Sequence, residues 1–192
     1  MSKNNIRVVS LTSDMCNKLK AQAAVAMNGD GTCSLKAMSM SCFASELCAS
    51  NRHSMMNLDY LMSHKYKFVA ITGDDDTFVG CVSAQSGDDD KTLKVYFPDC
   101  KLCTGALTLY NLCVSNSYRG LGIGRKLVES VLNIANRPSS VYLLVSKLNL
   151  SESDENRLKV YTDRINRLLG TYGKLEFDVI DECDSCYFLK HR

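Results

Sequence analysis

The hydrophobic period of the sequence changes near Val114, and this change limits which folds the chain can adopt. Residues 106–114 are apolar and rich in strand-forming types, which predicts a long strand. After a glycine-rich turn, apolar residues fall at helical spacing on one face: Leu127, Val128, Val131, Leu132 and Ala135. Residues 141–145 are continuously apolar, as expected for a buried strand parallel to its neighbour. A β–α–β unit is therefore predicted across about residues 106–146.

Weaker patterns predict the remaining elements. Strands are expected at residues 6–11, 67–72, 77–83, 93–97, 174–180 and 186–190. Helices are expected at about residues 12–27, 35–63 and 154–169, the last of them closed by Gly170. No internal repeat, low-complexity tract or linker divides the chain, so a single domain is predicted over residues 1–192.

The composition argues against several classes of partner. The formal net charge is +2 and no run of several Lys or Arg occurs, so no attraction to nucleic acid or to an anionic membrane is expected. No stretch approaches the roughly 20 apolar residues that cross a bilayer, and the first residues lack the apolar segment of a signal peptide. These features predict a cytoplasmic protein.

The sequence contains ten cysteines, most of them in apolar runs, where a reduced Cys behaves as a small hydrophobic residue. Two Cys-x-x-Cys pairs, Cys100/Cys103 and Cys183/Cys186, could together form a zinc site. We interpret them instead as reduced thiols in loops, because the chain has neither the signal peptide nor the small size that is typical of a disulfide framework. No metal site is predicted.

The segment that carries chemistry is the turn between the long strand and its helix, Arg119-Gly120-Leu121-Gly122-Ile123-Gly124. Glycines let a backbone approach a ligand closely, and the first turn of a helix offers unpaired N–H groups and a positive dipole end to a phosphate. The pattern differs from the Gly-x-Gly-x-x-Gly of dinucleotide-binding folds, and Arg125 follows Gly124 where a P-loop has Lys. The turn is therefore predicted to bind the pyrophosphate of a ligand other than those held by dinucleotide-binding folds and P-loops.

The residues from Val114 to Gly124, closed by Leu127 and Val128, resemble the acetyl-CoA motif of the GNAT acetyltransferases, Arg/Gln-x-x-Gly-x-Gly/Ala. The order of elements is similar too. A strand, helical pieces and an antiparallel hairpin precede the motif, and a parallel strand, a helix and a strand pair follow it. The resemblance implies an α/β (α+β) GNAT fold, with a mixed, mostly antiparallel sheet and two central, splayed parallel strands flanked by helices.

The resemblance also implies which residues bind acetyl-CoA. The backbone of Leu112, Cys113 and Val114 would pair with the pantetheine arm in the manner of a strand. Backbone amides would hold the pyrophosphate at Arg119, Gly120, Leu121, Gly122, Ile123, Gly124 and Arg125. Asn149, just after the second parallel strand, matches the family's Asn that contacts the cofactor arm, although an ordinary loop Asn is an equally good interpretation.

Acyl transfer to an amine needs a proton for the departing thiolate, and family members often supply it from a Tyr on the last helix. Tyr161 matches that residue, with core packing on an apolar helix face as the alternative interpretation. The segment departs from the family pattern, because Tyr172 lies in a stretch that also resembles the usual Tyr-x-x-x-Gly-Phe. Tyr172 is expected at the far end of the helix, so Tyr161 is preferred as the acid.

The base is not predicted. Many relatives carry a Glu on the motif strand a few residues before Val114, where this chain has Tyr110 and Asn111. The amine proton would leave through a water held by Asn111, or the amine would arrive already neutral. The histidines His53, His64 and His191 show no ligand spacing and receive no role.

The expected acceptor is a primary amine. The acidic turn Asp181-Glu182-Cys183-Asp184 lies where relatives often contact the acceptor, and acidic loops attract polycationic amines such as polyamines, although a solvated turn is the simpler interpretation. Protein N-terminal or lysine acetylation is one alternative, and a non-catalytic acyl-CoA sensor is another, because the motif strand lacks a carboxylate. A homodimer is left open. In this fold the two Cys-x-x-Cys pairs are expected at opposite ends of the sheet and should not meet.

Overall fold

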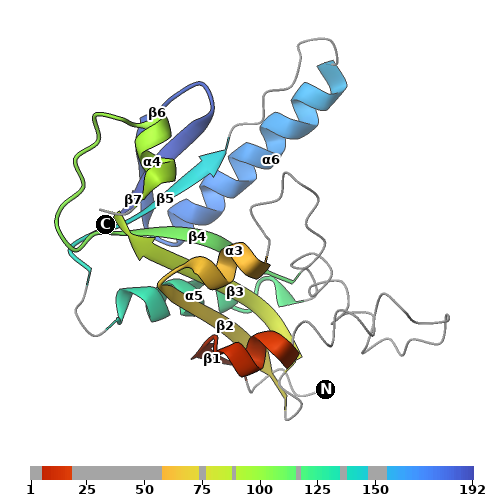
Figure 1. Cartoon of the computed structure of the whole chain (residues 1–192). Helices are drawn as coiled ribbons and strands as arrows, with labels where there is room; N and C mark the ends of the chain where they lie inside the picture. The colour runs from red at the N-terminus through yellow and green to blue at the C-terminus, as the bar shows by residue number, and fades with distance from the viewer. Residues whose placement is uncertain are drawn as a thin grey trace. The chain divides into compact units, whose positions relative to one another are not determined.

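A computed structural model of the chain describes residues 6–18, 58–73, 77–87, 90–115, 118–134, 138–146 and 155–192. These residues include one seven-stranded sheet in the order β1-β2-β3-β4-β5-β7-β6 (Figure 1). The strands are β1 (Ile6–Ser10), β2 (Tyr66–Thr72), β3 (Thr77–Ser86), β4 (Leu107–Val114), β5 (Val141–Ser146), β6 (Phe177–Glu182) and β7 (Cys186–His191). β4 and β5 are parallel, whereas β1–β2, β2–β3, β5–β7 and β6–β7 are antiparallel pairs. The predicted fold class, a mixed sheet containing a parallel pair and flanked by helices, is confirmed.

The described helices are residues 13–18, α3 (Leu58–Ser63), α4 (Lys91–Tyr96), α5 (Ile123–Leu132) and α6 (Glu155–Lys174). α5 connects β4 to β5 and completes the predicted β–α–β unit. Its buried face includes three residues that the helical spacing predicts: Leu127, Val128 and Val131. The remaining parts of the helices expected at residues 12–27 and 35–63 lie outside the described residues.

The chain groups into two compact units, and each is described by itself. Unit 1 consists of residues 1–84 and 110–135, and unit 2 consists of residues 85–109 and 136–192. The boundary falls inside two strands, after Ala84 in β3 and after Leu109 in β4. Both strands therefore contribute residues to each unit.

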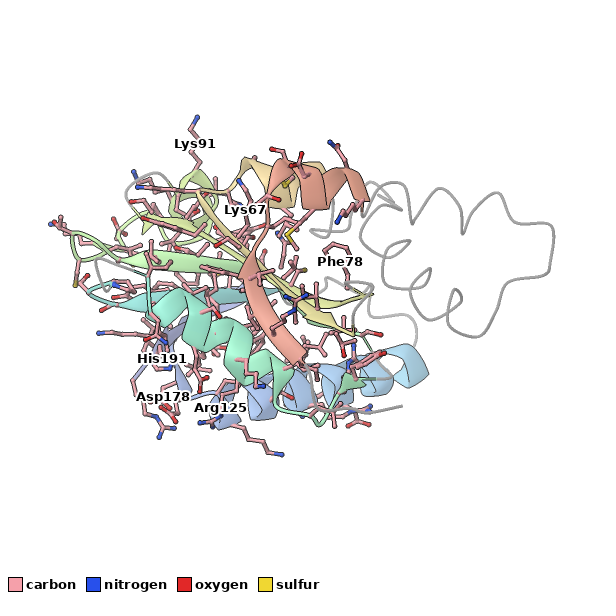
Figure 2. The ribbon with its side chains drawn as sticks, turned by 90° about the horizontal axis from the view of Figure 1, so that it is seen from below. Lys67, Phe78, Lys91, Arg125, Asp178 and His191 are labelled. Atoms are coloured by element: carbon pink, nitrogen blue, oxygen red, sulfur yellow. The ribbon has the colours of Figure 1, made fainter. Side chains whose placement is uncertain are left out.

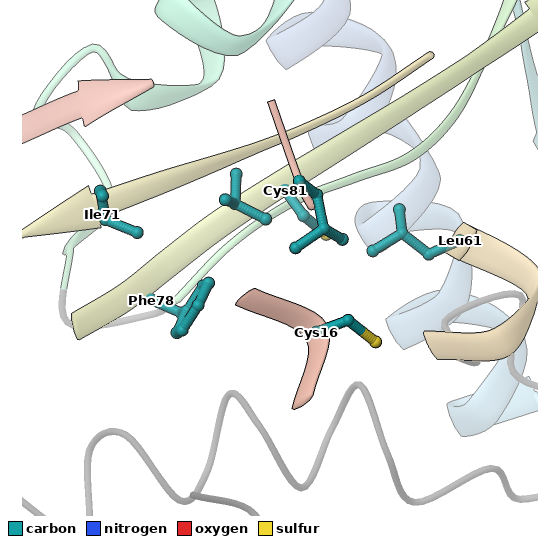
Figure 3. Packing of buried hydrophobic residues seen from close by; sticks show 7 residues of the cluster. Cys16, Leu61, Ile71, Phe78 and Cys81 are labelled. Atoms are coloured by element: carbon teal, nitrogen blue, oxygen red, sulfur yellow. The ribbon is translucent and has the colours of Figure 1, made fainter. Parts of the chain in front are cut away.

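The core of unit 1 lies between β2, β3 and short helices. Figure 3 shows buried members of this cluster: Cys16, Leu61, Ile71, Phe78 and Cys81. The opposite face of β3 receives α5, because a Cβ at Gly80 would lie 3.2 Å from Leu127 Cδ1. Gly80 precedes Cys81, and consecutive strand residues point to opposite faces of a sheet. Unit 1 therefore has helices on both faces of its strands (Figure 1).

Aromatic stacking organises the core of unit 2. The ring of Phe188 on β7 lies 5.1 Å from that of Phe97 and 5.2 Å from that of Tyr142 on β5, measured between centroids. Leu93 of α4 and Cys186 of β7 belong to the same buried cluster. α4, β5 and β7 therefore share one core.

The expected strand at residues 93–97 is wrong, because this segment is the helix α4. The fully buried Asp90 accepts a hydrogen bond from Leu93 N at 2.9 Å and so caps the helix. Leu93 and Phe97, four residues apart, are buried on one side, while Lys91 extends away from the ribbon (Figure 2). A run of Asp before an apolar segment predicts a turn as readily as a helix cap. Here the buried cap at Asp90 favours the helix.

The end of α6 also differs from the prediction. The helix continues past Gly170 to Lys174, because an interior glycine costs about 1 kcal/mol relative to alanine without ending a helix. The left-handed residue that follows the helix is Glu176, with a φ of 67°, and its N–H donates to Gly173 O at 3.1 Å. β6 therefore begins at Phe177 rather than at residue 174.

The expectation that the two Cys-x-x-Cys pairs lie at opposite ends of the sheet is wrong for Cys100, whereas no contact among the described residues places Cys103 beside the other pair. Cys100 and Cys183 both pack against the unit 2 cluster that contains Cys186. Burial and, secondarily, the Asp181 carboxylate raise the pKa of the Cys100 thiol. Leu93 of α4 and Phe97, which follows the helix, belong to the same cluster as Phe188 and so bring this segment to β7. Within the described ranges, no three His, Cys, Asp or Glu side chains gather as a metal site would require.

Candidate active site

The glycine-rich turn contains backbone conformations that glycine adopts freely. Gly120 and Gly122 have φ values of 78° and 75°, in the left-handed region where residues with a Cβ are strained. A Cβ built at either glycine would meet no atom within 4 Å, so the space beside the turn is open. Gly122 is the N-cap of α5, and no side chain of the described residues caps this helix end. This helix start therefore has the features of an anion-binding site.

Backbone hydrogen bonds and cations complete the turn. Ser115 N donates to Val79 O at 2.9 Å, and Arg119 Nε donates to Val114 O at 3.1 Å, which joins the turn to β3 and β4. Arg119 and Arg125 are exposed beside the amides, and Figure 2 labels Arg125 on α5. Open space, uncapped amides and cations together fit the pyrophosphate of coenzyme A.

The second half of β4 departs from regular strand geometry. Asn111 has a φ of 55°, which is left-handed and uncommon for a residue other than glycine. Its carbonyl oxygen accepts a hydrogen bond from Cys81 Sγ at 3.3 Å. From Asn111 to Val114 the strand is half-buried, whereas Leu107 to Tyr110 are buried. The segment predicted to pair with a pantetheine arm is therefore the part of β4 that follows this irregularity.

A buried polar network surrounds Asn111 and was not predicted. Ser83 Oγ lies 2.8 Å from His64 Nδ1, 3.1 Å from Asn111 Nδ2 and 3.3 Å from Tyr110 O. The rings of His64 and Tyr110 stack with centroids 4.9 Å apart. Lys67 Nζ donates to His64 O at 3.0 Å and so fixes the end of α3. The sequence gives no signal for these contacts, because the side chains that meet are 19 to 28 positions apart.

The predicted catalytic and cofactor-arm side chains are only partly described. Tyr161 lies within α6, but its side chain is outside the described residues, as is the whole of Asn149. Tyr172 lies at the far end of α6, as the sequence predicts. Its ring is half-buried and meets that of Phe177 edge-on, with centroids 6.3 Å apart.

A mixed sheet with a glycine-rich helix start is an arrangement that suits a phosphorylated cosubstrate. The family model described as "Acetyltransferase (GNAT) family" matches residues 35–161, which is more than half of the 192 residues. The chain belongs to the GNAT acetyltransferase family. It is an N-acetyltransferase, and acetyl-CoA is its cosubstrate.

Comparisons with individual proteins are more distant. No curated protein sequence matches this chain. The GNAT-family acetyltransferase of Staphylococcus aureus Mu50 is 12% identical, with a TM-score of 0.48 and coverage of 97% of this chain and 98% of that one. PaiA N-acetyltransferase from Thermoplasma acidophilum, in complex with coenzyme A, is 13% identical, with a TM-score of 0.49 and coverage of 98% and 99%. Arabidopsis thaliana Naa50, bound to the bisubstrate analogue CoA-Ac-MVNAL, is 17% identical, with a TM-score of 0.47 and coverage of 97% and 98%.

These likenesses are too distant to indicate a substrate. Among the described helices, none has both the length and the apolar composition needed to cross a bilayer.

Proposed function

We propose that this enzyme transfers the acetyl group of acetyl-CoA to a small cationic amine, with a polyamine as the best candidate. The uncapped amino end of α5, opened by Gly120 and Gly122, is the observation that carries cosubstrate binding. Three exposed carboxylates near the β6–β7 turn support a cationic acceptor: Asp181, Glu182 and Asp184. Clustered negative charge raises the local concentration of a polycation.

The residues proposed to hold acetyl-CoA divide into those that bind its pantetheine arm and those that bind its pyrophosphate. The backbone of Leu112, Cys113 and Val114 would bind the pantetheine arm, and Asn149 would contact it from the segment after β5. The pyrophosphate would be held by the amides of Arg119, Gly120, Leu121, Gly122, Ile123, Gly124 and Arg125. Acetyl-CoA would supply the thioester whose carbonyl carbon the amine attacks. The protein would bind and orient both substrates and supply a proton to the departing thiolate.

Tyr161 is proposed as the acid that protonates the departing thiolate. Its position in α6 supports this role over Tyr172, whose ring packs on Phe177 at the far end of the helix. Tyr161→Phe should lower kcat about 100-fold and leave the Kd for coenzyme A unchanged, because it removes only a proton donor. Tyr172→Phe is the matched control and should keep the wild-type kcat. Equal rates for the wild type and Tyr161→Phe would remove Tyr161 from the mechanism.

The acceptor is tested by following thiol release from acetyl-CoA with polyamines, lysine peptides and peptides with a free α-amine. A preference for polyamines supports the proposal, and a preference for either peptide class supports protein acetylation instead. The missing carboxylate at Tyr110 and Asn111 motivates the third function, an acyl-CoA sensor. Tight binding of coenzyme A in calorimetry without turnover of any amine would favour the sensor.

A single functional domain over residues 1–192, a cytoplasmic location and a homodimer remain predictions. Gel filtration with light scattering at micromolar concentration tests the dimer.

A further inference from the structure

The second Cys-x-x-Cys pair lies across the hairpin formed by β6 and β7 (Figure 1). Cys183 directly follows β6, Cys186 is the first residue of β7, and only Asp184 and Ser185 lie between them. Residues opposite each other in an antiparallel pair project to the same face of the sheet. The Cys183 N–H donates to Cys186 O at 2.9 Å, and the two sulfur atoms lie 3.5 Å apart. The hairpin therefore brings the two thiols into contact as a dithiol.

The first Cys-x-x-Cys pair has the same spacing but a different geometry. Cys100 and Cys103 follow α4 in a segment that is neither strand nor helix. Cys100 packs against the unit 2 cluster, whereas Cys103 is exposed, and the described residues show no contact between their sulfur atoms. Burial raises the pKa of the Cys100 thiol, with a smaller contribution from Asp181, which lowers its thiolate fraction and so its reactivity. Spacing alone therefore does not create a dithiol.

The two thiols of the hairpin differ in their access to solvent. Cys186 is only 2% exposed, in the cluster that contains Phe188, whereas Cys183 is half-buried. A thiol exchanges with a disulfide when its thiolate attacks one of the two sulfur atoms, so access decides which cysteine reacts first. Cys183 can meet a disulfide from solution. Cys186, whose sulfur lies 3.5 Å away, can then attack the mixed disulfide at Cys183.

The charges beside Cys183 indicate which disulfides it meets most often. Asp181, Glu182 and Asp184 are all exposed, on both sides of Cys183 in the sequence. Clustered negative charge raises the local concentration of cations and lowers that of anions. A cationic disulfide such as cystamine is therefore expected to react faster than the anionic glutathione disulfide.

We propose that Cys183 and Cys186 form a reversible redox site, which small cationic disulfides oxidise to an intramolecular disulfide. In the first step the Cys183 thiolate attacks the small disulfide, the S–S bond of that disulfide breaks, and one half leaves and takes up the proton that Cys183 lost. In the second step the Cys186 thiolate attacks Cys183 Sγ, and the other half leaves as a thiol with the proton that Cys186 lost. The two cysteines lose two electrons, and the small disulfide gains them. This exchange makes no use of acetyl-CoA, so it stands or fails independently of the proposed acceptor.

The test is oxidation of the full chain by cystamine, followed by alkylation of the remaining thiols and tryptic peptide mapping. Cys183 and Cys186 share the tryptic peptide 175–190, whereas Cys100 lies in the peptide 95–101 and Cys103 in the peptide 102–119. Peptide 175–190 should lose two hydrogen atoms and escape alkylation, about ten times faster than Cys100 is modified. Cys103 should instead retain cysteamine as a mixed disulfide. Dithiothreitol should restore every thiol.

Two variants separate the roles of the two thiols. Cys186→Ala should stop at the mixed disulfide, with one cysteamine retained on Cys183, because the second attack is lost. Cys183→Ser should leave Cys186 unmodified in the folded protein, because Cys186 is buried. Cys103→Ser is the matched control and should form the disulfide in peptide 175–190 at the wild-type rate.

The charge preference is tested with two disulfides and one double variant. At low ionic strength, cystamine should oxidise the wild type about tenfold faster than glutathione disulfide, and high salt should reduce this ratio. The double variant Glu182→Gln, Asp184→Asn removes two carboxylates and keeps both thiols, so it should reduce the ratio too. An unchanged ratio in the double variant would refute the role of the carboxylates.

Three results would overturn the redox site itself: no disulfide within peptide 175–190, a link from Cys183 to Cys100 in its place, or cysteamine that stays on Cys183 in the wild type. If Cys186→Ala does not melt cooperatively, the wild type and Cys183→Ser decide, because both keep the buried Cys186 side chain. Modification of Cys186 in folded Cys183→Ser, as fast as that of the wild-type pair, would contradict Cys183 as the attacking thiol.

Discussion

The two halves of β4 differ in burial, pairing and backbone geometry. Leu107, Thr108 and Leu109 are buried and pair in parallel with β5, through Val141, Tyr142 and Leu143. Tyr110 to Val114 belong to the other compact unit, and from Asn111 onward they are only half-buried. The second half also contains the left-handed residue and the polar network with Ser83.

This difference indicates that the first half of β4 serves mainly the stability of the fold, whereas the second half belongs to the candidate site. The first half is held by apolar burial, so its side chains can be exchanged only at a cost in stability. The second half leads into the turn that is proposed to hold the phosphates, and its hydrogen bonds orient groups rather than fill space. Substitutions in the two halves should therefore separate stability from ligand binding.

The largest expected effect is on stability in the first half. Leu109→Ala should lower the free energy of unfolding by about 2–5 kcal/mol, because it leaves a cavity at a buried position. Leu112→Ala, at a half-buried position of the second half, should lose less than half as much. Urea denaturation of both variants measures the difference. Equal losses would contradict the division of the strand.

The next largest effect is expected on cosubstrate binding, at the glycine-rich turn that follows the second half of β4. Gly122→Ala should raise the Kd for coenzyme A about tenfold or more, since alanine at a φ of 75° is strained by about 1–2 kcal/mol and its methyl group enters the open space beside the amides. Gly73→Ala is the matched control, with a φ of 73° and equally open surroundings, in the turn after β2. It should lose similar stability and keep the wild-type Kd. Calorimetry distinguishes the two, and equal Kd values would contradict a phosphate site at α5.

The smallest effect concerns Cys81, which donates to the carbonyl of Asn111. Burial, with a smaller contribution from the Cys113 thiol, raises the pKa of the Cys81 thiol well above its ordinary value. The folded state holds the Cys81 proton more tightly than the unfolded state does. The protonated thiol therefore contributes its full stabilisation at a pH below the unfolded-state pKa of about 8.5, and this contribution is lost as the pH rises above that value. The free energy of unfolding should fall by up to about 1.4 kcal/mol per pH unit through this thiol. Cys81→Ala should show a shallower decline between pH 8 and pH 10, and identical slopes would contradict the assignment.

The elements that carry the motif could be predicted from sequence because their signals are local. The strand before Val114, the glycine-rich turn, and the face of α5 at Leu127, Val128 and Val131 all follow from periodicity and glycine chemistry. The same is true of β5, whose continuous apolar run reflects its position between β4 and β7. The family resemblance at Arg119 to Gly124 agrees with the family match.

The features that escaped prediction depend on tertiary contacts. Asp90 becomes a helix cap rather than part of a turn because α4 buries Leu93 against Phe188. α6 passes Gly170 because one poor helix former does not outweigh its neighbours, and the left-handed end falls at Glu176 instead. The network of His64, Ser83 and Asn111 joins three elements that are distant in sequence, so no local pattern marks it.

The backbone at position 111 has a consequence for the residues that natural variation can place there. A φ of 55° admits glycine at no cost, tolerates asparagine and aspartate, and disfavours longer or branched side chains by about 1–2 kcal/mol. The backbone conformation therefore restricts which residues are tolerated at this position, whatever their chemical role. An acidic group that arises here would therefore come as aspartate rather than as glutamate.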